Sequence, residues 1–189
     1  MPDRLGADVP VTTQEAIVTS QRDIPSLKQR VQAEVDRLTP DLLATSRFLH
    51  TNPELAYEEY KAAEHLTTIV AQYGFAVTRG VAGLPTAFIA RTGAGSPRIA
   101  FLAEYDALPG LGHACGHNLI GTASLGAALA VKAVLGPTPG EVLLVGCPAE
   151  EKGGGKIPLV ESGAFAGTDA AMLVHPSNRT EMVKLALGM

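Results

Sequence analysis

The segment EVLLVGCPAEEKGGGK, residues 141–156, decides the fold predicted for this chain. Its first half is an apolar run of the length of one strand, and its second half is polar and rich in glycine. A short apolar run of this kind is typical of a strand that is buried on both faces of a sheet. Two acidic residues, Glu150 and Glu151, follow where this strand is expected to leave the core.

Apolar segments on both sides of this strand extend the pattern. Residues 118–135 are small and apolar almost throughout, which indicates a buried helix, and a shorter helix is expected over 156–162. The runs 98–103 and 170–174 are expected to be strands, the second of them buried and followed by His175. Strand, helix, strand, helix and strand in this order predict an α/β fold, with parallel pairing and helices on both faces of the sheet.

The residues before this core are expected to form helices from Ser26 onward, preceded by a flexible extension. Residues 1–25 are polar, lack periodicity and contain several prolines, so they are expected to form a flexible extension of a single domain over 26–189. Helical spacing begins at Ser26 and is expected to be interrupted at Pro40. A further helix is expected over 57–73, because its apolar residues recur at helical spacing and a glycine follows it.

Two short apolar runs, 86–90 and 98–103, are separated by a turn rich in Gly, Ser and Pro. This short connection predicts that the two strands pair with each other as a hairpin. A hairpin is antiparallel, so the whole sheet is expected to be mixed, although largely parallel.

The composition is that of an ordinary globular protein, with 46% hydrophobic and 18% charged residues in 189. The formal charge of −4 includes no basic patch, so nucleic acid is not expected as a partner. No stretch approaches the roughly 20 apolar residues that span a bilayer, and the first residues do not resemble a signal peptide. No membrane partner and a cytoplasmic location are therefore expected. The two cysteines do not make a disulfide framework, which suits a reducing compartment.

Polar clusters follow the predicted strands where parallel strands would meet at one edge of the sheet. They are Glu104 and Asp106 after 98–103, Glu150 and Glu151 after 141–147, and His175 after 170–174, with Cys115 and His117 at the start of the buried helix. Binding sites in sheets of this class lie at the carboxyl ends of the strands. These clusters are therefore expected to converge on one site.

Cys115 and His117 lie in the segment GHACGHN, residues 112–118. Residues two apart in extended backbone point to the same side, and thiolate with imidazole favours zinc among common ions. Taken alone, such a pair is more often a buried cysteine and a helix-capping histidine. His113 is either an outer partner of the site or simply a polar residue.

Neighbouring carboxylates repel each other unless a cation or a proton separates them. One of Glu150 and Glu151 is therefore expected to bind metal, and the other to act as general base on a water whose pKa zinc lowers to about 7. A solvated acidic loop is the alternative. Asp106 is expected to accept a hydrogen bond from a ligand imidazole, the alternative being an acid that forms the turn before residues 108–110.

The glycines that follow, KGGGK at 152–156, do not form a phosphate loop, because Lys156 precedes Ile157 where a nucleotide-binding loop needs Ser or Thr. They are expected to let the backbone approach the site closely. A lone histidine such as His175 is usually structural, but beside these clusters a ligand is the better interpretation. The whole set describes hydrolysis by a metal-activated water.

Several of these segments resemble the zinc aminoacylase/carboxypeptidase family, peptidase family M-twenty. They are AEYDALPGLGHACGHNLIG at 103–121, PAEEKGGGK at 148–156 and LVHP at 173–176. Upstream, LHTNPELAYEEYKAAEHL at 49–66 resembles the first helices of the amidohydrolase branch, which includes aminobenzoyl-glutamate hydrolases and a β-alanyl-lysine-type dipeptidase. The likeness runs from about Leu27 to Pro176.

The resemblance implies a three-layer zinc-peptidase-like catalytic domain that binds two divalent ions, zinc in the first place and manganese or cobalt as alternatives. It implies Cys115, His117, Glu151 and His175 as ligands and Glu150 as general base. The implied reaction is hydrolysis of a small amide, such as an N-acyl amino acid or a dipeptide.

The chain departs from the family pattern in two ways. Glu104 stands where many relatives carry a ligand histidine, although the amidohydrolase branch lacks that histidine too and uses the cysteine instead. The family also places a lid domain and a last ligand histidine beyond the position of Met189. Residues 26–189 are therefore expected to be the N-terminal part of a catalytic domain, poorly active alone, with a homodimer in a full-length form. The alternative is a non-catalytic truncated fragment that keeps the metal-site motifs.

Overall fold

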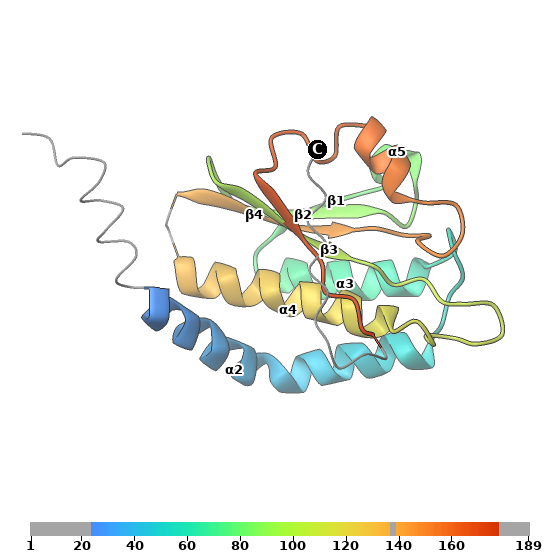
Figure 1. Cartoon of the computed structure of the whole chain (residues 1–189), viewed down its shortest axis with the longest axis horizontal. Helices are drawn as coiled ribbons and strands as arrows, with labels where there is room; N and C mark the ends of the chain where they lie inside the picture. Colours follow the sequence, from blue (N-terminus) through green and yellow to red (C-terminus); the bar gives the residue numbers. More distant parts are fainter. Residues whose placement is uncertain (1–23, 137–138, 178–189) are drawn as a thin grey trace, which may run out of the picture.

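The structure is a computed structural model that describes residues 24–136 and 139–177. At its centre lies strand β4 (Gly140–Gly146), in which every residue after Gly140 is buried. The five-stranded sheet has the order β1-β2-β4-β3-β5 (Figure 1). The other strands are β1 (Ala76–Arg79), β2 (Phe88–Ala94), β3 (Arg98–Ala103) and β5 (Ala170–Met172). Strand β3 runs parallel to β4 and β5, whereas β2 is antiparallel to β1 and β4, so the sheet is mixed as predicted.

The predicted hairpin between β2 and β3 is wrong, because β4 lies between them. Phe88 is the register partner of Gly146 on one side of β4, and Arg98 that of Glu141 on the other. The short connection passes the start of β4, where the Glu141 N–H donates to the carbonyl of Pro97 (2.8 Å). A strand buried on both faces needs backbone partners on both edges, and only the central place supplies them.

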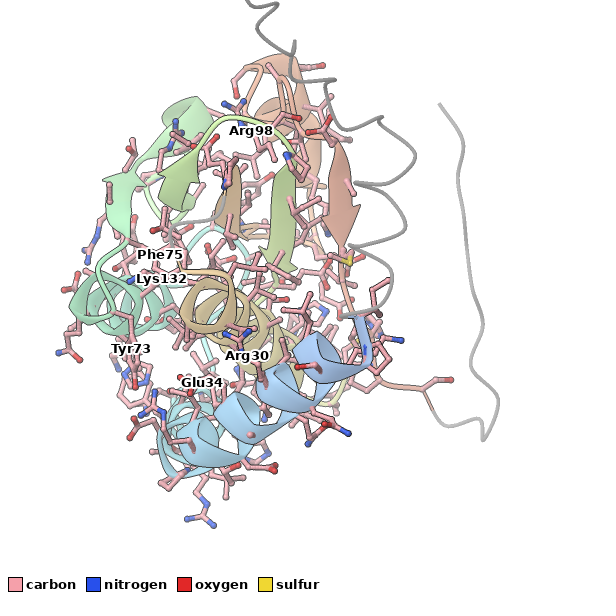
Figure 2. The ribbon with its side chains drawn as sticks, turned by 90° about the vertical axis from the view of Figure 1, so that its left-hand side faces the viewer. Arg30, Glu34, Tyr73, Phe75, Arg98 and Lys132 are labelled. Atoms are coloured by element: carbon pink, nitrogen blue, oxygen red, sulfur yellow. The ribbon has the colours of Figure 1, made fainter. Side chains whose placement is uncertain are left out.

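Three long helices cover one face of the sheet, and α5 (Lys156–Glu161) lies on the other (Figures 1 and 2). The long helices are α2 (Ile24–Thr51), α3 (Tyr60–Gln72) and α4 (His117–Leu135). Their core with the sheet includes Leu38, Leu49, Leu66, Leu125, Leu129, Phe88 and Leu144. On the opposite face Leu159 packs in a smaller cluster with Ile89, Leu143 and Val145. The α/β architecture with helices on both faces is therefore confirmed.

Helix α2 is continuous through Pro40, so the predicted interruption is wrong. The ribbon bends about midway (Figure 1), as expected where proline removes one backbone hydrogen bond and crowds the preceding turn. Packing against α4 supports both halves, because Leu38 before the proline is fully buried and Leu42 after it lies against Gly126. Tertiary contacts thus outweigh the local preference. The expected extension, 1–25, lies outside the described residues except for the first two residues of this helix.

Helix α3 begins at Tyr60, three residues later than predicted, because Tyr57 has φ +68° and cannot be helical. The Glu54 carboxylate accepts hydrogen bonds from the backbone N–H groups of Lys61 (3.1 Å) and Ala62 (2.9 Å) and so caps this end. At the other end Gly74 has φ +80°, which confirms its predicted place after the helix.

Helix α4 has 19 residues and is long and apolar enough, by length and composition alone, to cross a membrane. The expectation that no such stretch exists is therefore wrong. More than half of the helix is buried by the sheet and α2, so its place in the core accounts for its composition.

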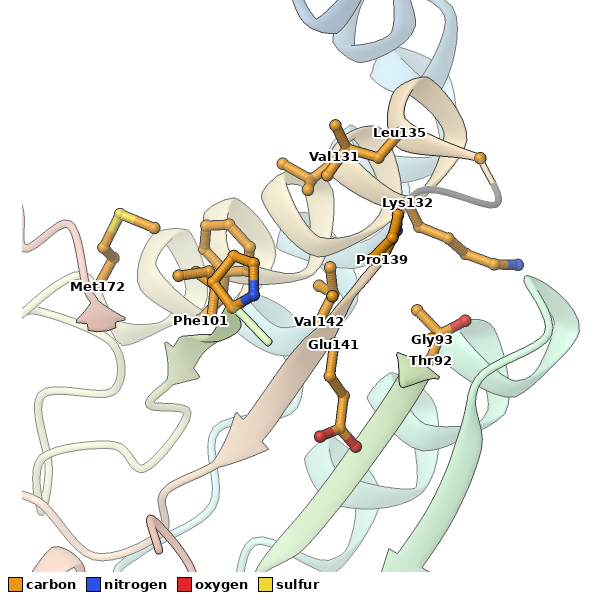
Figure 3. A pocket seen from close by; sticks show the side chains of 14 residues that line it. Thr92, Gly93, Phe101, Val131, Lys132, Leu135, Pro139, Glu141, Val142 and Met172 are labelled. Atoms are coloured by element: carbon orange, nitrogen blue, oxygen red, sulfur yellow. The ribbon is translucent and has the colours of Figure 1, made fainter. Parts of the chain in front are cut away.

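The last predicted strand is shorter than expected, and it is exposed rather than buried. Strand β5 pairs only with β3, at the sheet edge, and no described element covers it. Beside it lies a hollow of 430 Å³ between α4 and the sheet, lined mainly by apolar side chains that include Phe101, Val131 and Met172 (Figure 3). An apolar strand is buried only where another element packs against it. The apolar sequence of residues 170–174 therefore does not by itself decide whether the strand is buried.

Candidate metal centre

The polar residues predicted at the strand ends come together at one edge of the sheet. Glu104 and Asp106 follow β3, Glu150 and Glu151 follow β4, and His117 is the first residue of α4. The parallel register, in which Ala103 is the partner of Gly146, brings the segments after both strands side by side. The predicted convergence of these side chains is therefore present in the fold.

His117 lies at the middle of this group and is completely buried. Its Nδ1 is 2.9 Å from Asp106 Oδ1, while its Nε2 faces Glu104 Oε2 (3.5 Å), Glu151 Oε1 (3.6 Å) and Glu150 Oε2 (3.8 Å). Among the described residues, Nε2 of His117, Oε2 of Glu104 and Oε1 of Glu151 have no hydrogen-bond partner. Buried polar atoms are normally hydrogen-bonded, so three such atoms facing one another fit a bound cation.

Electrostatics favour the same interpretation. Burial lowers the pKa of His117, but the hydrogen bond to Asp106 and the surrounding carboxylates outweigh it and raise the pKa above its usual value. Burial acts to raise the pKa of Asp106, whereas the His117 ring and the backbone N–H groups of Glu150 and Glu151 lower it overall. The site therefore attracts positive charge at the position that Nε2 faces.

Asp106 joins the histidine to the acidic loop. Its Oδ1 accepts from His117, and its Oδ2 accepts from the backbone N–H of Glu151 (2.9 Å). The turn that follows forms from backbone hydrogen bonds between Leu108 and Gly112, without this carboxylate. The geometry thus agrees with the predicted role of Asp106 in orienting an imidazole.

Cys115 and His175 also lie close to His117. Cys115 Sγ is 3.5 Å from His175 Nε2, and the rings of His117 and His175 meet edge to face with centroids 5.9 Å apart. His175 Nδ1 lies 2.7 Å from the carbonyl oxygen of Pro176 and donates to it, which leaves Nε2 facing Cys115. Burial and the nearby Glu151 raise the pKa of the Cys115 thiol to about 11, so a thiolate at neutral pH needs a cation.

In the part of the chain that the structure describes, two groups of three residues have ligand atoms that all lie within 4.8 Å of one another. One is Cys115, His117 and His175, and the other is His117, Glu150 and Glu151. They share the buried histidine, whose Nδ1 is held by Asp106, so the two groups adjoin at Nε2 as neighbouring parts of one candidate metal centre. All six predicted site residues, Asp106 included, are therefore brought together. His113 is buried nearby but belongs to neither group.

Sequence reasoning missed the pairing of Glu104 with Lys156. Lys156 Nζ bonds Glu104 Oε1, which leaves Oε2 to face His117. The glycines before this lysine pack as closely as predicted, since a Cβ on Gly155 would lie 2.0 Å from the carbonyl oxygen of Pro148. The sequence analysis places Glu104 in the predicted cluster and marks it as a departure from the family pattern, but it gives Glu104 no partner. The available signal was a charged residue, Lys156, after a tight glycine loop.

Known proteins resemble this chain over most of its length, although no family model matches it. It is 44% identical over 173 residues to the Xaa-Arg dipeptidase of Mus musculus, covering 84% of this chain and 40% of that protein. It is 42% identical over 170 residues to a p-aminobenzoyl-glutamate hydrolase polypeptide of Escherichia coli, covering 76% of this chain and 35% of that protein.

A solved structure with a similar fold is that of the Bacillus subtilis YXEP protein, described as a dinuclear metal-binding peptidase of family M-twenty. The TM-score is 0.63 at 27% identity, and the match covers 74% of this chain and 42% of that chain. The chain thus spans about 40% of the length of the curated relatives that it matches.

Proposed function

This chain is homologous to peptidase family M-twenty over the part of those proteins that it spans, and on that premise we propose that it forms the metal-binding part of an amide hydrolase. The proposed substrate is small, a dipeptide or an N-acyl amino acid, because the relatives are named as a dipeptidase and an aminobenzoyl-glutamate hydrolase. The proposed reaction is attack of water on the amide carbonyl.

One observation carries the proposal. The buried Nε2 of His117 faces buried carboxylate oxygens of Glu104 and Glu151, and none of these atoms has a hydrogen-bond partner among the described residues. Asp106 holds Nδ1, so Nε2 is the ring nitrogen that can bind a cation in place of a proton. We propose two divalent ions, with Cys115, His117, Glu151 and His175 as ligands. Zinc is preferred to manganese or cobalt because the donor set includes a thiol.

The residues of the chain would divide the work. Divalent ions, when bound, lower the pKa of a water molecule and polarise the carbonyl to be attacked. Glu150 has the most exposed carboxylate of the cluster, with 41% of its side chain accessible, so it can reach both water and substrate. We propose that its carboxylate takes a proton from the water and passes it to the leaving amine. Asp106 keeps His117 oriented throughout.

A second candidate function is a non-catalytic protein that keeps the metal site, and zinc binding without hydrolysis would favour it. The 189 residues span about 40% of the length of the relatives named above. We propose that metal binding is the property to measure first on these residues. Both cysteines are free thiols, which is compatible with the cytoplasmic location that we propose.

The test is a zinc titration of the purified chain, with metal content and calorimetry as readouts. We expect two equivalents of zinc in the wild type and a clear loss in His117→Ala. A folded wild-type chain that takes up no zinc would overturn the proposal. Release of amine from a panel of dipeptides and N-acyl amino acids then separates the two candidate functions.

A further inference from the structure

Glu59 is a buried carboxylate that lies outside the metal centre. It directly precedes α3 and is 0% exposed. Its Oε1 accepts the backbone N–H groups of Tyr57 (2.9 Å) and Ala149 (2.8 Å), and its Oε2 accepts the Thr86 hydroxyl (2.8 Å). Burying a carboxylate is costly unless it is hydrogen-bonded, so a fully buried one with three donors has a specific structural task.

Both residues that bind Oε1 through their backbone have a left-handed conformation. Tyr57 has φ +68° and Ala149 has φ +55°, and among the described residues only one other non-glycine residue, Ala82, has a positive φ. This conformation costs a residue with a side chain about 1–3 kcal/mol and persists only where its surroundings enforce it. One carboxylate oxygen therefore stabilises two strained turns that lie 92 positions apart in the sequence, at 57 and 149.

The turn at Ala149 determines where the acidic loop points. Ala149 stands between the end of β4 and Glu150, so its backbone conformation sets the direction in which Glu150 and Glu151 leave the strand. Its N–H is held by Glu59 and its carbonyl by the N–H of Gly155 (3.2 Å). Beyond it, the loop is held through the Glu151 N–H by Asp106.

We propose that Glu59 is a positioning residue for the metal centre: its hydrogen bond to the Ala149 amide fixes the left-handed turn that aims the carboxylates of Glu150 and Glu151 at His117. This inference rests on the proposed function, because it gives those carboxylates a task. Glu59 touches neither substrate nor ligand atoms and acts only through the loop. Through its bond to Ala149 it connects the segment before α3 to the loop that follows β4.

Glutamine at position 59 is expected to preserve the hydrogen bonds that Glu59 makes, whereas alanine is not. The glutamine oxygen can accept both backbone N–H groups, and its amide nitrogen can donate to the Thr86 hydroxyl. Burial raises the pKa of Glu59, although its hydrogen bonds partly offset this, so a neutral isostere has no desolvation penalty of a charge to bear. The charge itself is then dispensable, and the hydrogen-bond pattern is what matters.

The experiment uses the 189-residue chain as wild type, Glu59→Ala, Glu59→Gln and a control, Thr67→Val. Thr67 is a buried residue of α3 whose hydroxyl bonds the Ala63 carbonyl (2.7 Å), away from the loop. Hydrogen exchange of the metal-free proteins measures protection of the amides at 149 and 151, and competition with a chromophoric chelator measures zinc affinity. Circular dichroism confirms that each variant is folded.

We expect E59A to lose protection at both amides and to bind zinc about 10–100-fold more weakly, as is usual when an outer partner of a metal site is removed. E59Q and T67V are expected to keep wild-type amide protection and wild-type zinc affinity. A folded E59A with wild-type protection and zinc affinity would overturn the inference, as would an equal loss in T67V. If E59A does not fold, Glu59→Asp, whose oxygens lie one carbon further back, should show the same losses, and an E59D chain indistinguishable from wild type overturns the inference.

The two arms separate this inference from the proposed function. A wild-type chain that binds no zinc defeats the proposed function, yet the exchange arm needs no metal. Loss of protection at 149 and 151 in E59A would then still establish that Glu59 holds the loop, and retained protection would still refute it.

Discussion

The two ends of β3 and β4 both gather charged residues, but only one end pairs them completely. At the amino end, which faces the viewer in Figure 2, the Arg98 guanidinium bonds the Glu141 carboxylate and the Ala166 carbonyl (2.7 Å). The backbone N–H of Arg98 donates to Asp169 (2.7 Å). Charge at this end joins β4 and the segment before β5 to β3.

The carboxyl end of the same strands contains buried charge that is not satisfied in this way. His117, Glu104 and Glu151 each have a buried atom without a hydrogen-bond partner among the described residues. Each such atom costs about 1–3 kcal/mol, so a fold tolerates a group of them where a ligand satisfies them. Charge alone therefore does not distinguish a structural cluster from a binding site, whereas unsatisfied hydrogen bonding does.

The strongest test of this difference replaces the central residue at each end. His117→Ala should weaken zinc binding by more than about 100-fold, the upper range for an outer partner, because it removes the residue that both ligand groups share. Glu141→Gln at the opposite end should leave zinc affinity unchanged. Calorimetric titration of both variants is the measurement, and equal losses in the two would remove the distinction between the ends.

The next largest effect is expected at Asp106, which is fully paired although it belongs to the unsatisfied end. Asp106→Asn should lower zinc affinity about 10–100-fold, because asparagine has one acceptor oxygen and cannot accept from both the His117 ring and the Glu151 N–H. Asp169→Asn is the matched change at the paired end and should not alter zinc binding. An Asp106→Asn chain with wild-type affinity would show that the His117 ring is oriented without this bond.

The candidate site could be predicted because its members are close in sequence or follow predicted strands. Cys115 and His117 are two apart, Glu150 and Glu151 are adjacent, and each set lies at an element boundary that the apolar runs mark. Parallel pairing then brings separate strand ends to one edge. These site residues could therefore be identified without knowing which distant segments pack together.

Features that depend on distant contacts could not be predicted. Lys156 meets Glu104 across 52 positions, and Ala149 meets Glu59 across 90, and no local spacing encodes either contact. The place of β4 between β2 and β3 has the same cause, because a short connection fits both a hairpin and two strands with a third between them. Pro40 stays helical only because α4 supports α2, which again is a tertiary effect.

A smaller effect, on stability rather than binding, is expected from Glu141→Gln. Hydrogen bonds to charged groups contribute about 1.5–3 kcal/mol, and glutamine can keep part of the bond with Arg98, so a loss of about 1.5 kcal/mol in the free energy of unfolding is expected. Urea denaturation of the metal-free chain measures it. The same measurement on Glu104→Gln should show no comparable loss, because the glutamine oxygen can still accept from Lys156 and its amide can donate to an atom of His117 or Glu151 that lacks a partner. A larger loss there would weaken the contrast between the two ends.

The smallest expected effect is a pH dependence of stability that comes from Glu59. This residue is a third kind of buried acid, because it is fully hydrogen-bonded but has no cation beside it. Burial raises its pKa above the usual 4.5, so the folded chain binds this proton more tightly than the unfolded chain. Its contribution to stability is therefore greatest below pH 4.5 and is lost as the pH rises through the raised value, by about 1.4 kcal/mol for each unit of difference. Glutamine does not titrate, so the free energy of unfolding of wild type minus that of Glu59→Gln should fall between pH 4.5 and 8. Paired urea denaturation curves test this. A difference that rises with pH would mean that the carboxylate is stabilised as an anion, and the buried charge at 59 would then belong with the paired end of the sheet.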